Sequence, residues 1–215
     1  MALTREAVVE SALRLGDAEG LDAVTIRRLA QELGVTPMAL YWHFKNKDLL
    51  FIGMIDELMA DVCVDLGTDP WLAGVRGQVD ALVAGLRAHP YMPELFQLTE
   101  KIRSENFARA TEAALTFLTR GGFPLGRAYQ VASYLLQASC ALVANQPCPV
   151  AQQLVDPGAW LHQMRLGLSR YPSTVFPLLN AYSEELVERP DLDDYYGYGV
   201  ELIMASIETM AAREP

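Results

Sequence analysis

TIRRLAQELGVTPMALYWHFKNK, from Thr25 to Lys47, decides the fold, because its apolar spacing and turn signals indicate two short helices joined by a tight turn. In the first half, Leu29 and Leu33 are four residues apart and give a helix one inward face. Gly34 then ends that helix, since glycine readily takes the left-handed conformation of a helix C-terminus. The chain restarts at Thr36-Pro37, a hydroxyl N-cap followed by proline at the first helical position. The stretch is therefore predicted to be a helix-turn-helix.

The second of these helices carries aromatic side chains on the side away from the core. Leu40 and Phe44 are four residues apart and form its inward pair, which leaves Met38, Tyr41 and Trp42 on the opposite side. In a DNA major groove, aromatic rings can touch thymine methyl groups, and a hydroxyl or indole N–H can reach a phosphate. The pattern favours a DNA-recognition helix. The alternative is that the two aromatic residues are partly buried against the first helix.

Charge is distributed unevenly along the chain and agrees with this interpretation. Residues 25–47 hold four Lys or Arg against one Glu, a net charge of +3, although the whole chain has a formal net charge of -10. Residues 1–50 hold six basic and seven acidic side chains, so that residues 51–215 carry the remaining -9. An acidic C-terminal part repels phosphate, and contact with DNA is expected only from the N-terminal part.

Residues 4 to about 60 resemble the DNA-binding domain of the TetR family of transcriptional regulators, and LYWHFKNKDLL at 40–50 is the most specific part of the match. The resemblance implies that Tyr41 and Lys47 contact phosphates and that Thr25 caps a helix near the DNA backbone. It also implies that Arg27 faces the bases, where its guanidinium can bind guanine O6 and N7. The complete set of DNA-binding residues expected is Thr25, Arg27, Arg28, Thr36, Pro37, Met38, Tyr41, Trp42, His43 and Lys47.

The rest of the chain is predicted to be helical, because no segment alternates with period two for long enough to form a strand. We expect an all-α protein with a helix-turn-helix DNA-binding domain over residues 1–50 and an effector-binding and dimerisation domain over 51–215. Proline and glycine positions divide the second domain, with Pro172 and Pro177 interrupting one helical region and a mobile loop at residues 146–157. The helices expected there are 47–67, 71–88, 91–98, 104–120, 124–145, 160–169 and 193–212.

The stretch from Ala128 to Val155 contains no charged residue and is longer than the roughly 20 residues that cross a bilayer. Polar side chains nevertheless recur along it at helical spacing, which favours a buried helix of a soluble protein over a membrane span. This polar stripe is either a solvated face or a lining that offers hydrogen bonds to a bound small molecule. Its members are Gln130, Ser133, Tyr134 and Gln137.

The number and spacing of the cysteines and histidines limit the redox and metal chemistry that the chain can support. The odd number of cysteines, without a CxxC pair, indicates reduced thiols and a cytoplasmic protein, and the charged N-terminal segment lacks the pattern of a signal peptide. Redox sensing by Cys140 and Cys148 is a minor alternative. Three histidines far apart in sequence argue against a metal site, and a structural role for His43 is favoured over a metal-binding one. No cofactor is expected.

The last helix predicts a partner surface, because Tyr195, Tyr198, Leu202, Ser206 and Met210 form one stripe along it. The segment YGVELIM at 198–204 is similar to the tetracycline-repressor branch of the TetR family. By this resemblance, the helix at 124–145 and the final helix build a homodimer. Such a dimer places two recognition helices in successive major grooves of a palindromic operator, about 34–36 Å apart.

The resemblance also implies a cavity for a small-molecule effector in the second domain, with helix 47–67 transmitting a tilt to the DNA-binding domain. The stretch from Leu98 to Ile102 lacks the histidine with which tetracycline repressors bind their magnesium-chelated drug, so tetracycline is not the expected effector. The effector itself is not specified by the sequence. Each candidate lining residue could also be ordinary core, and the candidates are Phe96, Phe107, Phe117, Tyr134, Gln137, Trp160 and Met164.

The function expected from these features is that of a DNA-binding repressor released from its operator by a small molecule. The alternative from another functional class is an enzyme, a helical hydrolase that uses Cys140 or a serine with His162. The chain has no G-x-S-x-G elbow and no phosphate-cradling glycine loop, and we expect no enzyme. A third interpretation, a helix-turn-helix used only for protein contact, predicts no DNA binding at any salt concentration.

Overall fold

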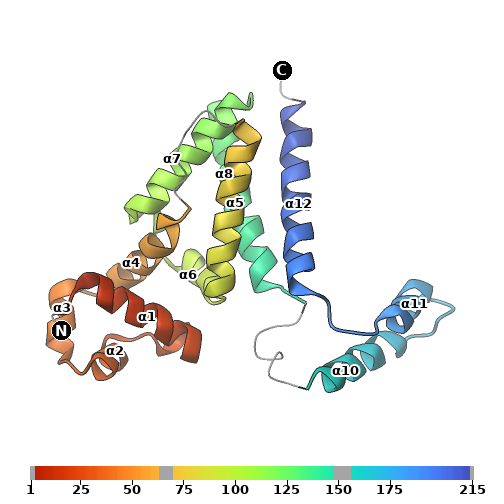
Figure 1. The fold of residues 1–215 in the computed structure, drawn as a ribbon, viewed down its shortest axis with the longest axis horizontal. Helices are drawn as coiled ribbons and strands as arrows, with labels where there is room; N and C mark the ends of the chain where they lie inside the picture. Colours follow the sequence, from red (N-terminus) through yellow and green to blue (C-terminus); the bar gives the residue numbers. More distant parts are fainter. Residues whose placement is uncertain (1–2, 63–69, 148–155, 214–215) are drawn as a thin grey trace. The chain divides into compact units, whose positions relative to one another are not determined.

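The computed structural model describes residues 3–62, 70–147 and 156–213, and all regular structure in these ranges is helical (Figure 1). The all-α prediction is therefore confirmed. The chain forms two compact units, one of residues 1–144 with 199–215 and one of residues 145–198. The α-helices are α1 (Arg5–Glu19), α2 (Ile26–Leu33), α3 (Pro37–His43), α4 (Lys47–Ala60), α5 (Trp71–Ala88), α6 (Met92–Leu98), α7 (Glu105–Arg120), α8 (Leu125–Ala144), α10 (Pro157–Ser169), α11 (Pro177–Glu185) and α12 (Leu192–Ala211). Short 3-10 helices, η1 (Leu21–Ala23) and η2 (Lys101–Arg103), precede α2 and α7.

The turn between α2 and α3 has the predicted caps. Gly34 has φ 66° and ψ 31°, in the left-handed region, and ends α2. The Thr36 hydroxyl accepts a hydrogen bond from the Ala39 N–H at 3.3 Å, directly before Pro37 at the start of α3. Asn46 caps α4 in the same way, accepting from the Leu49 N–H at 2.9 Å. These local bonds fix where each helix begins and are readable from sequence.

The N-terminal segment of residues 3–46, called the head below, has its own small apolar core. Leu40 and Phe44, the predicted inward pair of α3, are fully buried, together with Leu29 of α2. Val8 and Ala12 from α1 complete the core. Helices α1, α2 and α4 pack around it, so that the outer face of α3 is held rigidly toward solvent.

Helices α5, α7 and α8 pack on one another and form the centre of the larger unit, and α4 packs against α7 (Figure 1). Gly74 permits the close contact of α5 with α7, because a Cβ at this position would overlap the Phe117 ring. At the end of α7, the rings of Trp71 and Phe123 meet edge to face with centroids 6.2 Å apart. None of the helices within the described ranges is long and apolar enough to cross a membrane.

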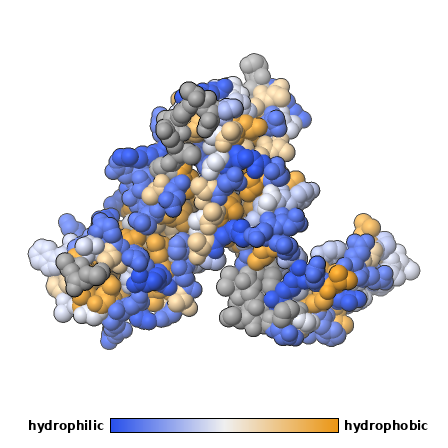
Figure 2. Space-filling view, viewed as in Figure 1, coloured by the Kyte–Doolittle hydropathy of each residue, from blue (hydrophilic) through white to orange (hydrophobic). Residues whose placement is uncertain are grey.

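The second unit contains the α10–α11 hairpin, whose helices pack on each other. The sequence predicted that Pro177 interrupts a helix. In the structure Pro177 instead begins α11, because proline is well accommodated in the first turn of a helix. Many of the hairpin's large apolar side chains are exposed, and Figure 2 shows hydrophobic residues among the hydrophilic ones on its surface. They include Leu166, Val175, Leu178 and Val187.

Helix α12 has two apolar faces. Its buried face consists of Tyr196, Val200, Ile203, Met204 and Ile207. The stripe predicted from sequence lies on the other side, where Tyr198, Leu202 and Met210 are exposed in the single chain. The sequence therefore identified the free face and missed the one that packs within the chain. Cys63, Cys148 and the loop expected at 146–157 lie wholly or mostly outside the described residues.

Candidate DNA-binding surface and effector site

The outer face of α3 presents the predicted recognition residues to solvent. Trp42 is 86% exposed and Tyr41 is 46% exposed, so burial against the first helix of the motif does not account for either ring. Met38 is also exposed, as are Thr36 and Pro37 at the start of the helix. His43, the last residue of α3, is half-buried. A large aromatic side chain that is exposed on an otherwise packed motif is typical of a surface that a binding partner covers.

The two neighbouring arginines of α2 have different surroundings. The Arg28 guanidinium pairs with Glu19 of α1, Nη2 to Oε1 at 2.5 Å, and also approaches Glu32 at 3.9 Å. The backbone N–H of Arg28 donates to the Thr25 hydroxyl at 3.1 Å, which confirms Thr25 as the N-cap of α2. Arg27 is exposed and has no ion pair within the described part of the chain. Arg28 therefore ties α2 to α1, whereas Arg27 has its donors available.

Lys47 opens α4 at the edge of this surface. Its ammonium group lies 4.8 Å from the centroid of the Phe51 ring, which holds the side chain at the first turn. Lys45 precedes it and is exposed. At the start of α1, the Arg5 guanidinium lies over the buried Phe44 ring at 4.6 Å. Basic side chains thus flank the chain segment that forms α3, and positive charge of this kind is suited to a polyanion.

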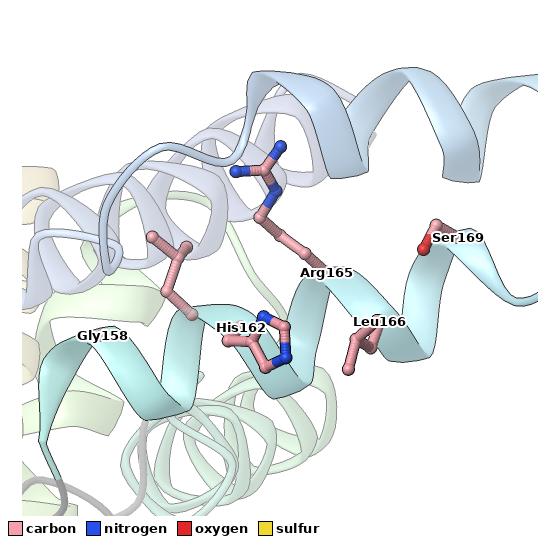
Figure 3. A pocket seen from close by; sticks show the side chains of 6 residues that line it. Gly158, His162, Arg165, Leu166 and Ser169 are labelled. Carbon is pink, nitrogen blue, oxygen red and sulfur yellow. The ribbon is translucent and has the colours of Figure 1, made fainter.

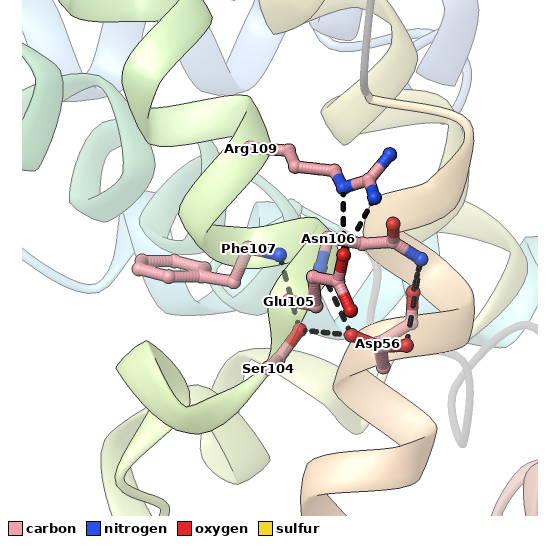
Figure 4. Close-up of polar contacts among 6 residues, drawn as sticks. All are labelled: Asp56, Ser104, Glu105, Asn106, Phe107 and Arg109. Atoms are coloured by element: carbon pink, nitrogen blue, oxygen red, sulfur yellow. Dashed lines mark hydrogen bonds and ion pairs between the residues drawn. The ribbon is translucent and has the colours of Figure 1, made fainter.

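Helix α4 leaves the head, and Asp56 near its C-terminal end joins it to the start of α7 (Figure 4). One carboxylate oxygen of Asp56 accepts hydrogen bonds from the Ser104 hydroxyl at 2.7 Å and from the Asn106 N–H at 3.0 Å. The Asn106 side chain donates in return to the Asp56 carbonyl at 3.0 Å. Ser104 itself caps α7 by accepting from the Phe107 N–H at 3.0 Å. Asp56 and Asn106 thus join α4 directly to the first turn of α7.

The candidate effector residues are distributed over both units. Phe96 and Phe107 lie together, with ring centroids 6.4 Å apart. Phe117 is buried against Gly74 between α5 and α7. The remaining four lie elsewhere: Tyr134 and Gln137 are exposed on α8, while Trp160, buried, and Met164, partly exposed, belong to α10 in the second unit.

Two buried polar side chains that the sequence reading missed lie in the helical bundle. Gln78 of α5 donates from Nε2 to the Ala110 carbonyl at 2.9 Å, and its Oε1 has no partner among the described residues. The Ser139 hydroxyl of α8 is fully buried and likewise has none in that part of the chain. A buried polar atom without a hydrogen-bond partner costs about 1–3 kcal/mol of stability. In the sequence, each is a polar residue on an otherwise apolar helix face, and this pattern is the signal that could have identified it.

A shallow hollow of about 340 Å³ lies along one face of α10 (Figure 3). It is open to solvent, unlike the enclosed cavities that bury most of a small ligand. Within the described residues, no three His, Cys, Asp or Glu side chains come together in a group that could hold a metal ion. The lining residues are Gly158, Leu161, His162, Arg165, Leu166 and Ser169.

Cys140, proposed as nucleophile in the hydrolase alternative, is buried in α8. Burial raises the pKa of its thiol from 9.0 to about 11. At neutral pH the sulfur is therefore protonated and is a poor nucleophile. The structure gives this residue the properties of a core side chain.

Comparison with known proteins identifies relatives along the whole chain. Residues 8–54 match the family model of bacterial regulatory proteins of the tetR family, and residues 65–211 match that of the tetracyclin repressor-like C-terminal domain. The HTH-type transcriptional repressor DrrR1 of Streptomyces coeruleorubidus is 27% identical over 98% of this chain and 79% of its own length. The class D tetracycline repressor protein of Escherichia coli is 25% identical over 96% of this chain and 89% of its own.

Solved structures agree with these matches. Apo ActR from Streptomyces coelicolor superimposes with a TM-score of 0.79 at 27% identity, and the comparison covers all of both chains. ActR in complex with actinorhodin gives a TM-score of 0.78 at 26% identity, over 98% of this chain and 99% of that one.

Proposed function

The chain belongs to the TetR family of bacterial regulatory proteins, and from this premise we propose that it is a repressor which a small molecule releases from its operator. As a member of this family it is a transcriptional regulator and not an enzyme, which removes the hydrolase alternative. The observation that carries the proposal is the solvent-exposed Trp42 on a helix-turn-helix whose other faces are packed.

DNA contact is proposed for the head, within a DNA-binding domain of residues 1–50 and an effector and dimerisation domain of residues 51–215. Arg27 and the face of α3 are proposed to meet the bases, with Tyr41 and Lys47 on phosphates. The Glu19 ion pair supports a positioning role for Arg28 rather than direct readout. Thr25, Thr36, Pro37, Met38, Trp42 and His43 complete the proposed set.

The effector is proposed to be an organic molecule that binds without a metal or cofactor among α5, α6, α7 and α8. ActR binds actinorhodin, and this relative supports an effector of comparable kind. Gln78 Oε1 requires a hydrogen-bond donor from the ligand, because its Nε2 is already engaged by Ala110. The aromatic candidates Phe96, Phe107 and Phe117 belong to α6 and α7, and with Tyr134 and Gln137 of α8 they remain proposals for this lining. Trp160 and Met164 belong to α10 in the second unit and remain separate candidates.

A homodimer on a palindromic operator is proposed from the free faces of α8 and α12. Leu125 and Tyr129 of α8 are exposed in the single chain, as are Tyr198, Leu202 and Met210 of α12. Large apolar side chains repeated along two long helices are typical of a four-helix interface between two copies.

The proposal is tested by fluorescence anisotropy of the purified protein with DNA from upstream of its own gene, over a series of salt concentrations. Tight binding at one palindromic site that weakens steeply with salt is the expected result. The double variant Tyr41→Ala/Lys47→Ala should lose this binding and remain folded, since Tyr41 is exposed and Lys47 is half-buried at the start of α4. Binding that is indifferent to both substitutions contradicts the assigned surface. A complete lack of binding to any DNA favours the protein-contact interpretation.

A further inference from the structure

Lys101 places a positive charge in the larger unit beside buried polar groups. It belongs to η2, between α6 and α7, and its side chain is half-buried. Its ammonium group donates to the Phe96 carbonyl, near the end of α6, at 3.2 Å. This hydrogen bond uses one of the three donors of an ammonium group. Within the described part of the chain, Lys101 forms no ion pair with a carboxylate.

Helix α8 brings an uncharged surface close to this ammonium group. It packs against α6 and has no charged residue from Ala128 to its end at Ala144. Burial raises the pKa of the Cys140 thiol in this helix, and the positive charge of Lys101 acts in the opposite direction. The ammonium therefore lies near the inner side of a helix that offers hydroxyl, amide and thiol groups but no carboxylate.

The acidic side chains nearest in the fold or the sequence are engaged with other groups. Glu100 approaches Arg103 at 3.7 Å. The Asp56 carboxylate is held by the two hydrogen bonds at the start of α7. A half-buried ammonium group has lost part of its hydration, and a charge-assisted hydrogen bond to an anion is about twice as strong as a neutral one. Lys101 is thus placed to gain from an anion that comes from outside the chain.

Two hydroxyl groups of the same region lack a partner within the described residues. Thr99 Oγ1, two positions before Lys101, is buried and unpaired there. Ser139 Oγ, on the residue before Cys140, is also buried and unpaired in that part of the chain. Hydroxyl and ammonium groups can both donate hydrogen bonds to an oxyanion. Thr99, Lys101 and Ser139 are called the anion site below.

We propose that the effector carries an anionic group, such as a carboxylate, phenolate or sulfonate, which binds at the anion site as the counter-ion of Lys101. This inference rests on the proposed function, because it names the chemical class of the effector. The rings of Phe96 and Phe107, with centroids 6.4 Å apart, lie at the same end of α6 and can pack on the apolar part of the molecule. The site therefore selects aromatic acids over neutral molecules of the same shape.

The test is a pair of fluorescence titrations of the full-length protein without DNA. Anilinonaphthalene sulfonate is the anionic probe, and phenylnaphthylamine, which has the same rings without the sulfonate, is the neutral probe. Lys101→Met should weaken binding of the anionic probe by about 10-fold or more, the value of one charge-assisted hydrogen bond, and change that of the neutral probe by less than about two-fold. Lys101→Arg keeps the charge and should retain the preference for the anionic probe.

Arg103→Met is the matched control, because Arg103 is an exposed cation of the same short helix and already approaches Glu100. It should leave both affinities unchanged. Binding of the probes to exposed apolar side chains of α10 and α11 is common to all variants and cancels. If circular dichroism finds Lys101→Met unfolded, Lys101→Gln replaces it, since glutamine is uncharged and can still donate to the Phe96 carbonyl.

Equal affinity of the natural protein and Lys101→Met for the anionic probe overturns the proposal. A parallel loss of both probes also overturns it, because Lys101 then acts only by supporting the end of α6. So does a natural protein that shows no saturable binding of the anionic probe. Because no DNA is used, the preference for an anion can hold while operator binding fails, and operator binding can hold while the preference fails.

Discussion

At the scale of single residues, Arg27 and Arg28 show how the same side chain serves two purposes on adjacent positions of α2. The Arg28 guanidinium is neutralised by Glu19 on another helix, and that contact joins α1 to α2. Arg27 projects to solvent without such a partner in the described residues. A formal charge of +3 over residues 25–47 therefore overstates what is available to DNA.

Arg27→Ala should weaken operator binding by about 10- to 100-fold and relax base preference, because a bidentate contact with guanine is worth roughly 1–3 kcal/mol of discrimination. Arg28→Ala should have a smaller effect on operator affinity and should lower the melting temperature through loss of the link to Glu19. Anisotropy and thermal unfolding of the two variants separate these roles. Equal losses of affinity without a change in stability contradict the distinction.

The Cys140 thiol should resist iodoacetamide in the folded protein at pH 8, because burial raises its pKa to about 11 and leaves almost no thiolate. The folded state holds this proton more tightly than the unfolded state does. The thiol therefore contributes stability at neutral pH that is lost as the pH rises from about 9 towards 11. Mass mapping of the Cys140 peptide after timed alkylation, with a denatured control, measures this. Rapid labelling of Cys140 in the native protein contradicts a core role and revives redox sensing.

At the scale of helices, α4 is held by two contacts of different kinds, an N-cap at its start and a side chain near its other end that binds α7. Asn46 caps its first turn through a bond within the same segment, and Asp56 near its other end reaches across to α7. The first contact fixes where the helix begins, and the second ties it to the domain that is proposed to bind the effector.

Asp56→Ala should lower the free energy of unfolding by about 2 kcal/mol, because Ser104 and the Asn106 N–H lose a charged acceptor. It should also reduce the response of the head to any molecule that releases DNA. Urea unfolding measures the first effect. Glu57→Ala is the matched control, since Glu57 is an exposed acid one position along the same helix. Equal stability of the two variants contradicts the bracing role of Asp56.

The contrast between these contacts also explains what the sequence could predict. The helix-turn-helix and its caps were predictable because Gly34, Thr36 and Pro37 act on residues within one turn of themselves. The inward positions of Leu40 and Phe44 followed from helical periodicity. Asp56 with Asn106 and Gln78 with Ala110 involve partners 32 to 50 positions apart, and no local pattern specifies them.

At the scale of the whole molecule, the proposed dimer depends on whether the free face of α12 meets a second copy. Leu202→Glu should weaken self-association by roughly 100-fold or more, because an unpaired charge would be buried between apolar helices. Light scattering coupled to size exclusion should then report a monomer of 23.8 kDa. Ile102→Glu is the control, since Ile102 is 62% exposed and Leu202 57%. An unchanged dimer in the Leu202 variant places the interface elsewhere.

The two apolar faces of α12 have a consequence for the life of the protein in the cell. If chains pair through this helix, a newly made chain without a partner displays Tyr198, Leu202 and Met210 to chaperones and proteases. Unpaired chains are then removed faster than pairs. The concentration of dimer then rises more than in proportion to the rate of synthesis. At low expression, the target gene is therefore unregulated rather than partly regulated.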